Sequence, residues 1–312
     1  FEHGNIDEKF TSSDLIIDEK ISSHRYSAMP METRSARATY DPAEESIVVR
    51  ASTQIPHQMR MAIGQVFGLS ESRIEVLAGD VGGGFGAKLS VDSEYFAILG
   101  SILCERPVNW VESRTEWMHA GPGARDYHTS SRMAFTRAGK ILAMETKILA
   151  DMGCDGAERG AGIGMPLNGG NYAPGPYIID TYRTHVECVV TNKGPYNAYR
   201  GYGKDLANML IERILDQAAD RLEIDPIEIR RRNLLTSYPF QLVTGPIIEN
   251  GSLRECLDRL ETNMGLSELR EQQIAALESG RYLGMALIPY IEPAGATFPG
   301  STSQNYESVT VK

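Results

Sequence analysis

The sequence has few cysteines, no long apolar run and no excess of positive charge. Its four cysteines form no CxxC pair, which excludes a local nucleus for a zinc or iron–sulfur site. No apolar run approaches the roughly 20 residues that span a bilayer. The 41 acidic residues outnumber the 31 basic ones, for a formal net charge of −10. This balance argues against a nucleic-acid binder, which needs a basic face.

The length and composition indicate a folded protein with more than one core. With 312 residues, 42% of them hydrophobic, the chain is long enough for about two packed units. Scattered cysteines are typical of reduced thiols, which predicts a cytoplasmic location. The chain starts with Phe1 rather than Met, and we expect a processed or excised piece.

Hydrophobic periodicity predicts an α+β protein, because helical patterns and hairpin-like runs are mixed without strict alternation. We expect residues 153–176, crowded with glycine and proline, to be an ordered loop. Strands are predicted over residues 46–52, 74–78, 108–111, 128–135, 141–150, 182–191, 282–291 and 306–311. Helices are predicted over residues 56–69, 90–104, 206–222, 253–260 and 267–277, and from Asp225-Pro226 onward.

These elements suggest four segments. Residues 1–40 are expected to be an extended N-terminal connection, and residues 41–120 an α/β subdomain with a glycine-rich loop. Residues 121–280 are expected to form an α+β subdomain, and residues 281–312 the start of a following domain.

The glycine-rich loop over residues 79–88 is the most informative segment. Glycines let a backbone approach a ligand closely and adopt positive φ. With a helix N-terminus behind them, their N–H groups could form an anion pocket. A tight strand-to-helix turn without a ligand is the alternative explanation.

Two nucleotide-binding motifs compare poorly with this loop. Gly82, Gly84 and Ala87 satisfy G-x-G-x-x-A, but no second βαβ unit follows, as a dinucleotide-binding fold requires. A P-loop is excluded because Ala87 separates Gly86 from Lys88.

Residues 81–88, VGGGFGAK, resemble the GGGFG-x-K loop of the molybdenum hydroxylase large subunit, the family of xanthine dehydrogenase, aldehyde oxidase and carbon monoxide dehydrogenase. Other segments resemble that family's motifs in the same order, over roughly residues 1–290. They are Pro30-Met31-Glu32, Ser52-Thr53-Gln54, Ala198-Tyr199-Arg200-Gly201-Tyr202-Gly203, Glu212-Arg213 with Asp216 and Ala219, and Asp225-Pro226 with Arg230 to Asn233.

The resemblance implies a molybdenum-cofactor-binding domain of the aldehyde oxidase/xanthine dehydrogenase type, with two α/β subdomains and mixed sheets. It implies an oxidoreductase that uses molybdenum-molybdopterin, in bacteria often the cytosine dinucleotide form. The substrate would be an aldehyde, an N-heterocycle or a related small molecule, with water as the oxygen source. A second molybdenum-binding domain, with the general-base glutamate, and subunits that carry FAD and [2Fe–2S] clusters would be its partners.

The same resemblance assigns roles to matched residues. Gln54 would hydrogen-bond an oxo ligand of the metal, and Phe85 would stand beside the reacting centre; these are the candidate catalytic residues. Further cofactor contacts would come from Gly83, Gly84, Gly86, Arg200 and Gly201. Phe85, Tyr199 and Tyr202 would line the substrate pocket.

Structural alternatives exist for three of these residues. Gln54 could be an exposed glutamine at a strand end, and Phe85 a core aromatic. Arg200 could be a surface arginine packed on two tyrosines. The cluster at Arg230 to Arg232 is interpreted as a solvated face at a helix C-terminus rather than an anion site.

The sequence also departs from particular members of the family. Gly201 stands where carbon monoxide dehydrogenases carry a copper-binding cysteine, which disfavours a molybdenum–copper centre. Leu89 stands where xanthine dehydrogenases place a glutamate, which disfavours purine selectivity. The six histidines form no H-x-x-x-H pair, so a metal bound by protein side chains is not expected.

Two other functions remain as alternatives. A split subunit could scaffold the cofactor for a partner without catalysing a reaction itself. A nucleotide-binding dehydrogenase could use the glycines at residues 82–87. In the primary interpretation the chain supplies half of a cofactor cleft, and we expect no turnover from it alone.

Overall fold

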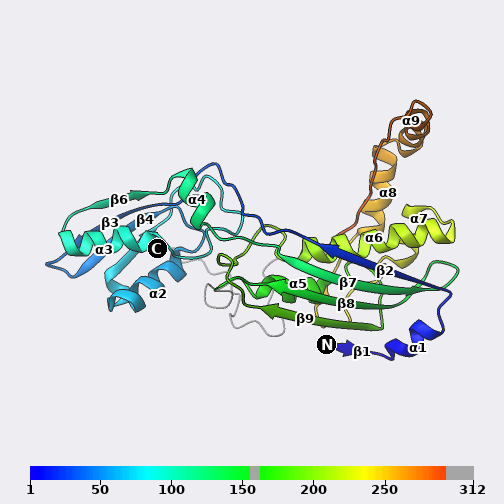
Figure 1. Cartoon of the computed structure of the whole chain (residues 1–312), viewed down its shortest axis with the longest axis horizontal. Coiled ribbons are helices and arrows are strands. Elements are labelled where there is room, and N and C mark those ends of the chain that lie inside the picture. Colours follow the sequence, from blue (N-terminus) through cyan, green and yellow to red (C-terminus); the bar gives the residue numbers. More distant parts are fainter. Residues whose placement is uncertain (155–161, 293–312) are drawn as a thin grey trace.

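A computed structural model describes residues 1–154 and 162–292 of the chain. The molecule is elongated, with a small sheet at one end, a larger sheet at the other, and a helical arm that projects from the larger end (Figure 1). Both sheets mix parallel and antiparallel pairs, and helices cover them, so the predicted α+β class with mixed sheets is confirmed.

The small sheet has the strand order β5-β4-β3-β6. Helices α2 and α3 cover one face of it, and their residues Met59, Ile63, Ala97 and Ile98 share one core with the strands. Strand β4 reads SIVVRA with every second residue buried, the pattern of a strand with one covered face. The elements are β3 (Ser35–Asp41), β4 (Ser46–Ala51), α2 (Pro56–Phe67), the 3₁₀ turn η1 (Glu71–Arg73), β5 (Ile74–Leu77), α3 (Glu94–Cys104) and β6 (Val108–Val111).

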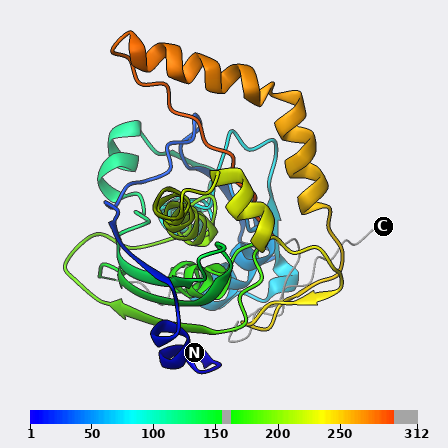
Figure 2. The ribbon, with the colours of Figure 1, turned by 90° about the vertical axis from the view of Figure 1, so that its right-hand side faces the viewer.

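The large sheet has the order β1-β9-β8-β7-β2, in which only β8 and β9 run parallel. Met133 and Met144 face helices α5 and α6, whereas Ala134 and Ala143 face α1 on the opposite side. Figure 2 shows these helices on the two faces of the sheet. The elements are β1 (Glu2–His3), α1 (Ile6–Thr11), β2 (Leu15–Ser22), β7 (Tyr127–Phe135), β8 (Ile141–Asp151), α5 (Gly164–Tyr172), β9 (Tyr182–Val189) and α6 (Lys204–Leu222).

The small sheet is inserted into the large one. The chain places β2 in the large sheet, builds the small sheet over residues 35–111, and returns through α4 (Arg114–Ala120) to β7. The outgoing and returning segments touch at an antiparallel bridge between Tyr26 and Ala124.

Helix α7 (Pro226–Asn233) packs on α6. Asp225 caps it as predicted, since its carboxylate accepts hydrogen bonds from the N–H groups of Ile227 and Glu228. The prediction of a solvated face is wrong for Arg230, which is 2% exposed and lies 2.6 Å from Glu212 through its Nε atom.

The arm consists of α8 (Leu253–Asn263) and α9 (Leu266–Glu278), which follow a short hairpin of β10 (Phe240–Gln241) and β11 (Ile247–Ile248).

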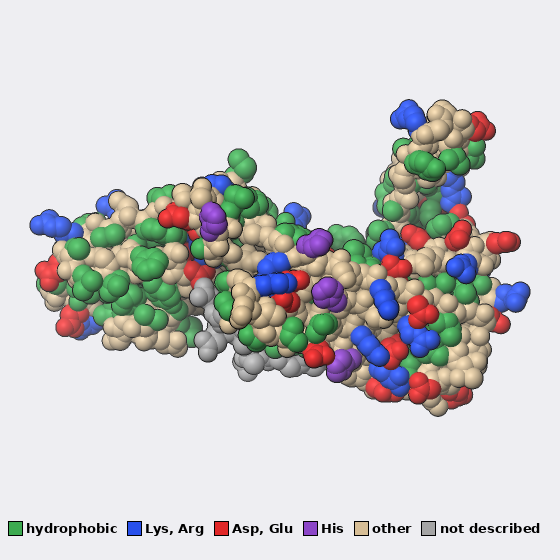
Figure 3. All heavy atoms as spheres, in the orientation of Figure 1, with side chains coloured by type: hydrophobic (Ala, Val, Ile, Leu, Met, Phe, Trp, Pro, Cys, Tyr) green, Lys and Arg blue, Asp and Glu red, His purple; other side chains and the backbone are tan. Residues whose placement is uncertain are grey.

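At the other end of the molecule, apolar side chains gather over α3 (Figure 3), where Phe96, Leu99 and Leu103 are exposed. No helix within residues 1–154 and 162–292 has the length and apolarity to cross a membrane.

The structure corrects three predictions of secondary structure. Residues 1–40 are not mainly a connection, because they contain β1, α1, β2 and nearly all of β3. Strand β2 is polar because it is a sheet edge, and Ile17 is its only buried residue. Within residues 162–176 the chain forms helix α5 rather than loop, since Asn168, Gly169 and Gly170 pack closely in the core.

The predicted strand over residues 282–291 is also not formed within the described part of the chain. Its residues from Met285 to Glu292 alternate between covered and exposed positions, but no neighbouring strand pairs with them there. The predicted strand over residues 306–311 lies outside the described residues.

Candidate functional site

The glycine-rich loop after β5 approaches another part of the backbone closely. Gly83 and Gly86 have φ of 98° and 96°, which favours glycine. A Cβ atom on Gly86 would lie 2.8 Å from the carbonyl oxygen of Ala198, which is backbone and cannot turn away. Glycine is therefore required where this loop meets the segment that contains Arg200.

Gln54 is fixed against the loop by its side-chain carbonyl. Oε1 accepts hydrogen bonds from the N–H groups of Gly86, at 3.0 Å, and Lys88, at 3.2 Å. Two backbone donors on one oxygen assign the amide orientation, and within the described parts of the chain Nε2 then donates to no protein acceptor. A Cβ atom on Gly84 would lie 2.6 Å from the carboxamide carbon. Gln54 is therefore exposed but oriented, unlike a mobile glutamine at a strand end.

Behind the loop, Glu32 joins three of the sequence motifs. Its Oε2 accepts hydrogen bonds from Ser52 Oγ at 2.5 Å, from the Gly82 N–H at 2.8 Å and from Lys88 Nζ at 2.9 Å. Desolvation works in the opposite direction, but the hydrogen bonds from Ser52, Lys88 and Gly82 lower the pKa of Glu32. Lys88 is 1% exposed. Sequence reasoning matched Glu32 and Lys88 to motifs but assigned them no role; the structure shows that they hold the loop in place.

The Arg200 loop lies directly against the glycine-rich loop. The N–H of Arg200 donates a hydrogen bond to the carbonyl oxygen of Phe85 at 2.9 Å. Gly201, Tyr202 and Gly203 follow with φ of 96°, 47° and 89°, three successive left-handed residues. The structure thus brings Gln54, the glycine-rich loop and the Arg200 loop together.

The aromatic residues differ in where they lie. Phe85 is 44% exposed, so the alternative of a core aromatic does not hold. Tyr199 packs against the cluster of Ala28, Ala87 and Trp117. Tyr202 is half-buried near Gly164, and burial raises the pKa of its hydroxyl.

Arg125, which the sequence analysis did not identify, makes the packing contacts with two tyrosines that were suggested for Arg200. Its guanidinium lies 4.4 Å from the ring centroid of Tyr199 and 5.3 Å from that of Tyr26. The arginine packed on two tyrosines is therefore Arg125, whereas Arg200 is exposed. No motif or periodicity in the sequence around residue 125 could have identified it.

The arrangement presents hydrogen-bond donors to an acceptor-rich ligand. Among the described residues, the N–H groups of Gly83, Gly84 and Phe85 donate to no protein acceptor. Together with Nε2 of Gln54 they leave a set of donors beside an exposed phenyl ring. The expected helix dipole does not contribute, because α3 begins only at Glu94. The first turn of α3 also carries an acid of its own, Glu94, whose pKa is raised by burial.

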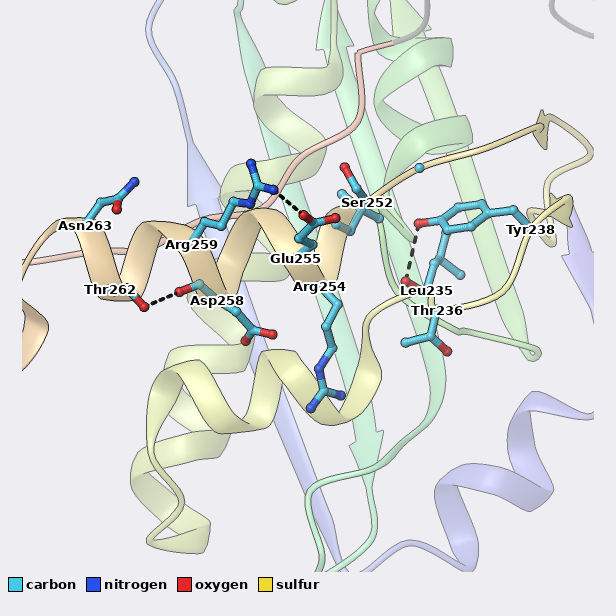
Figure 4. Close-up of a pocket in the computed structure, with 12 residues that line it drawn as sticks. Leu235, Thr236, Tyr238, Ser252, Arg254, Glu255, Asp258, Arg259, Thr262 and Asn263 are labelled. Atoms are coloured by element: carbon cyan, nitrogen blue, oxygen red, sulfur yellow. Dashed lines mark hydrogen bonds and ion pairs between the residues drawn. The ribbon is translucent and has the colours of Figure 1, made fainter.

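One cavity lies away from these loops. It has a volume of about 670 Å³ and opens at the base of the arm, between α8 and the segment around Tyr238 (Figure 4). Its lining includes Ser252, Arg254 and Asp258, and none of the predicted site residues. In residues 1–154 and 162–292 no cluster of three or more His, Cys, Asp or Glu side chains could hold a metal ion.

Comparisons with known proteins identify the family of the chain. Residues 1–234 match the family model of the molybdopterin cofactor-binding domain. The chain is 31% identical to the nicotine 6-hydroxylase large subunit of Paenarthrobacter nicotinovorans, over 99% of this chain and 39% of that protein. It is 32% identical to the carbon monoxide dehydrogenase large chain of Afipia carboxidovorans, over 88% of this chain and 34% of that one.

Solved structures share the fold of this chain. Quinoline 2-oxidoreductase from Pseudomonas putida 86 superposes with a TM-score of 0.83 at 30% identity, covering 88% of this chain and 35% of that one. The chain therefore spans little more than a third of the length of these relatives.

Proposed function

Because the chain belongs to the molybdopterin cofactor-binding domain family of the molybdenum hydroxylases, we propose that Gln54, the glycine-rich loop and the Arg200 loop together hold the pterin cofactor. The observation that carries this proposal is the Arg200 N–H bonded to the Phe85 carbonyl at 2.9 Å. This bond joins two loops that lie 115 residues apart in the sequence (200 minus 85).

The residues present fit such a group. The N–H groups of Gly83, Gly84 and Phe85 and the Nε2 of Gln54 supply donors for oxo and phosphate oxygens. Gly86 keeps the backbone bare where the two loops meet, and Gly201 leaves room for the Asp205 side chain. The Arg200 side chain adds a cation beside them. We extend the proposal to the cytosine dinucleotide form, which needs room for a second phosphate.

When bound, the molybdenum cofactor supplies the redox centre at which an oxygen atom from water reaches the substrate. Gln54 then acts as a donor with a fixed orientation, because the N–H groups of Gly86 and Lys88 hold its oxygen. The exposed ring of Phe85 offers an apolar wall that excludes water and suits a flat substrate.

The substrate proposed is an aldehyde or an N-heterocycle. Two similar proteins carry N-heterocyclic substrates in their names, nicotine and quinoline, and the exposed phenyl ring of Phe85 supports this class. Tyr199 and Tyr202 are proposed to complete the pocket, because they flank Arg200 and its neighbour Gly201 in the sequence and Tyr199 packs on Ala87 of the glycine-rich loop.

The partners proposed are a second molybdenum-binding domain or subunit, an iron–sulfur subunit and an FAD subunit. Residues 285–292 support the first of these, since they alternate between covered and exposed positions like an edge strand. We propose that residues 281–312 begin the following domain and that its sheet pairs with this segment.

The test is molybdenum analysis and pterin fluorescence on the intact, co-expressed complex. Molybdenum and pterin are expected to co-purify with the wild-type chain. Gln54→Met should lower the pterin content severalfold, because it removes the oriented donor. Gln65→Met, at an exposed position on α2, should not. A wild-type complex without molybdenum and pterin would refute the proposal.

A further inference from the structure

Arg125 lies in the segment between α4 and β7, in a conformation that its surroundings impose. Its φ is 63°, a left-handed value that residues other than glycine rarely adopt. The segment is fixed by two backbone hydrogen bonds: Tyr26 N–H donates to Ala124 O at 3.2 Å, and Ala124 N–H donates to Tyr26 O at 2.9 Å. Uncommon backbone conformations held by the fold often mark functional positions.

The guanidinium of Arg125 joins Tyr26 to the stretch from Tyr199 to Asp205. It stacks on Tyr199 and donates hydrogen bonds to the Tyr26 hydroxyl and to the Arg200 carbonyl oxygen. Its Nε also lies 2.8 Å from Oδ2 of Asp205, at the start of α6. A planar guanidinium can stack on a ring while it donates to two oxygens and pairs with a carboxylate, a geometry that a lysine does not reproduce.

These contacts hold the Arg200 loop from behind. The carbonyl of Arg200 accepts from Arg125, while the N–H of Arg200 donates to Phe85 in the glycine-rich loop. At the far end of the loop, Oδ1 of Asp205 accepts from the Gly203 N–H at 3.1 Å. Arg125 and Asp205 therefore hold both ends of a loop with three successive left-handed residues.

We propose that Arg125 is a positioning residue that fixes the Arg200 loop against the glycine-rich loop. It sets the spacing between the two loops that would hold the pterin. The link to the pterin rests on the proposed function, whereas the effect on the loops follows from the contacts alone. Burial raises the pKa of Asp205 although Arg125 opposes this, so removing Arg125 would leave an unpaired acid under the loop.

The test compares Arg125→Met with Arg132→Met in the full 312-residue chain by amide hydrogen exchange. Arg132 is the matched control, because it also pairs with an acid, Asp18 at 2.7 Å, and stacks on a ring, Phe10 at 4.8 Å, but on β7 away from the loops. In Arg125→Met the Arg200 and Tyr202 amides should exchange about tenfold faster, while those of the small sheet stay unchanged. Arg132→Met should leave both amides at wild-type rates.

The outcomes separate the inference from the proposed function. Wild-type exchange at Arg200 in Arg125→Met would overturn the positioning role, and so would faster exchange spread evenly over both sheets. Arg125→Lys keeps the charge near Asp205, and we expect it to restore part of the protection. Pterin content of the co-expressed complex is measured in parallel and should fall in Arg125→Met. A wild-type complex that lacks pterin would refute the proposed function and leave the exchange result valid.

Discussion

At the level of single residues, the candidate site depends on side chains behind its loops as much as on those within them. Glu32 bonds to Ser52, Gly82 and Lys88, and Gln54 bonds to the amides of the same loop. Glycine at position 84 is needed for this contact, because any side chain there would meet the Gln54 carboxamide.

We predict that Gly84→Ala displaces Gln54 and destabilises the protein by about 1–3 kcal/mol, the usual cost of overpacking a close contact. The measurement is the free energy of unfolding in urea. Gly79→Ala is the matched control in the same loop, because a Cβ atom there meets nothing within 4 Å. Equal stabilities of the two variants would contradict the role given to Gly84.

We predict that Glu32 makes stability depend on pH on the acid side. Its pKa is lower in the folded protein than its ordinary value of 4.5, so its stabilising contribution is complete above that value. The contribution is lost as the pH falls through the lower folded pKa. The difference in unfolding free energy between the wild type and Glu32→Gln should therefore be largest near neutral pH and shrink towards pH 3. Glu75→Gln, at an exposed position on β5, should show no such trend.

At the level of elements, α6 and α7 are joined by a buried ion pair, and a tyrosine hydroxyl donates to its carboxylate. Arg230 lies 2.6 Å from Glu212, and the Tyr177 hydroxyl donates to the other oxygen of Glu212 at 2.6 Å. The same arginine reaches Asp216 on the exposed side of α6 at 2.8 Å. These motif residues hold the two helices together rather than binding a ligand.

We predict that Arg230→Met destabilises the protein by about 3–5 kcal/mol, because it leaves the Glu212 carboxylate buried without a cation. Asp216→Asn should cost less than about 1 kcal/mol, since that partner is largely exposed. Both values come from denaturant unfolding. A small loss of unfolding free energy in Arg230→Met would mean that water reaches Glu212 in the folded protein.

The sequence predicted elements well where periodicity and caps agreed. Helix α6 was expected from its apolar stripe, and α7 from Asp225-Pro226. Helix α5 was missed because its three glycines and its proline are not typical of a helix, whereas its close packing needs small residues. Strand β2 was missed because only one of its residues is buried.

At the site, motifs identified the glycine-rich loop, Gln54 and the Arg200 loop, because these resemblances are local in sequence. The position of Arg125 could not be predicted, since its partners come from two distant parts of the chain, Tyr26 and the stretch from Tyr199 to Asp205. Local patterns carry no information about such tertiary contacts.

At the level of the whole molecule, the outer part of the arm makes few buried contacts with the rest of the protein. Helix α9 buries only Leu266, and Tyr282 is 91% exposed. A helix of this length is marginal in water unless it packs on something. Residues 279–284 are all exposed, and we expect this stretch, which precedes the core contacts of Met285 and Leu287, to open readily.

We predict that trypsin cleaves the isolated chain after Arg281 before it cuts within either sheet, because proteolysis favours exposed backbone. A time course followed by mass spectrometry gives the order of cleavage. Arg183, on strand β9 of the large sheet, serves as the internal reference. Cleavage at Arg183 as early as at Arg281 would contradict the prediction.

The insertion of the small sheet into the large one also dictates an order of events during synthesis. Strand β2 leaves the ribosome more than a hundred residues before its partner β7, whose residues 128–135 pair with it. Of the two sheets, the small one is complete by residue 111 and can fold before the large one, and its folding brings residues 22 and 127 within reach of each other. Until then the apolar start of β2 at Leu15, Ile16 and Ile17 has no strand to pair with. We expect a chaperone that binds short apolar segments to bind the nascent chain there.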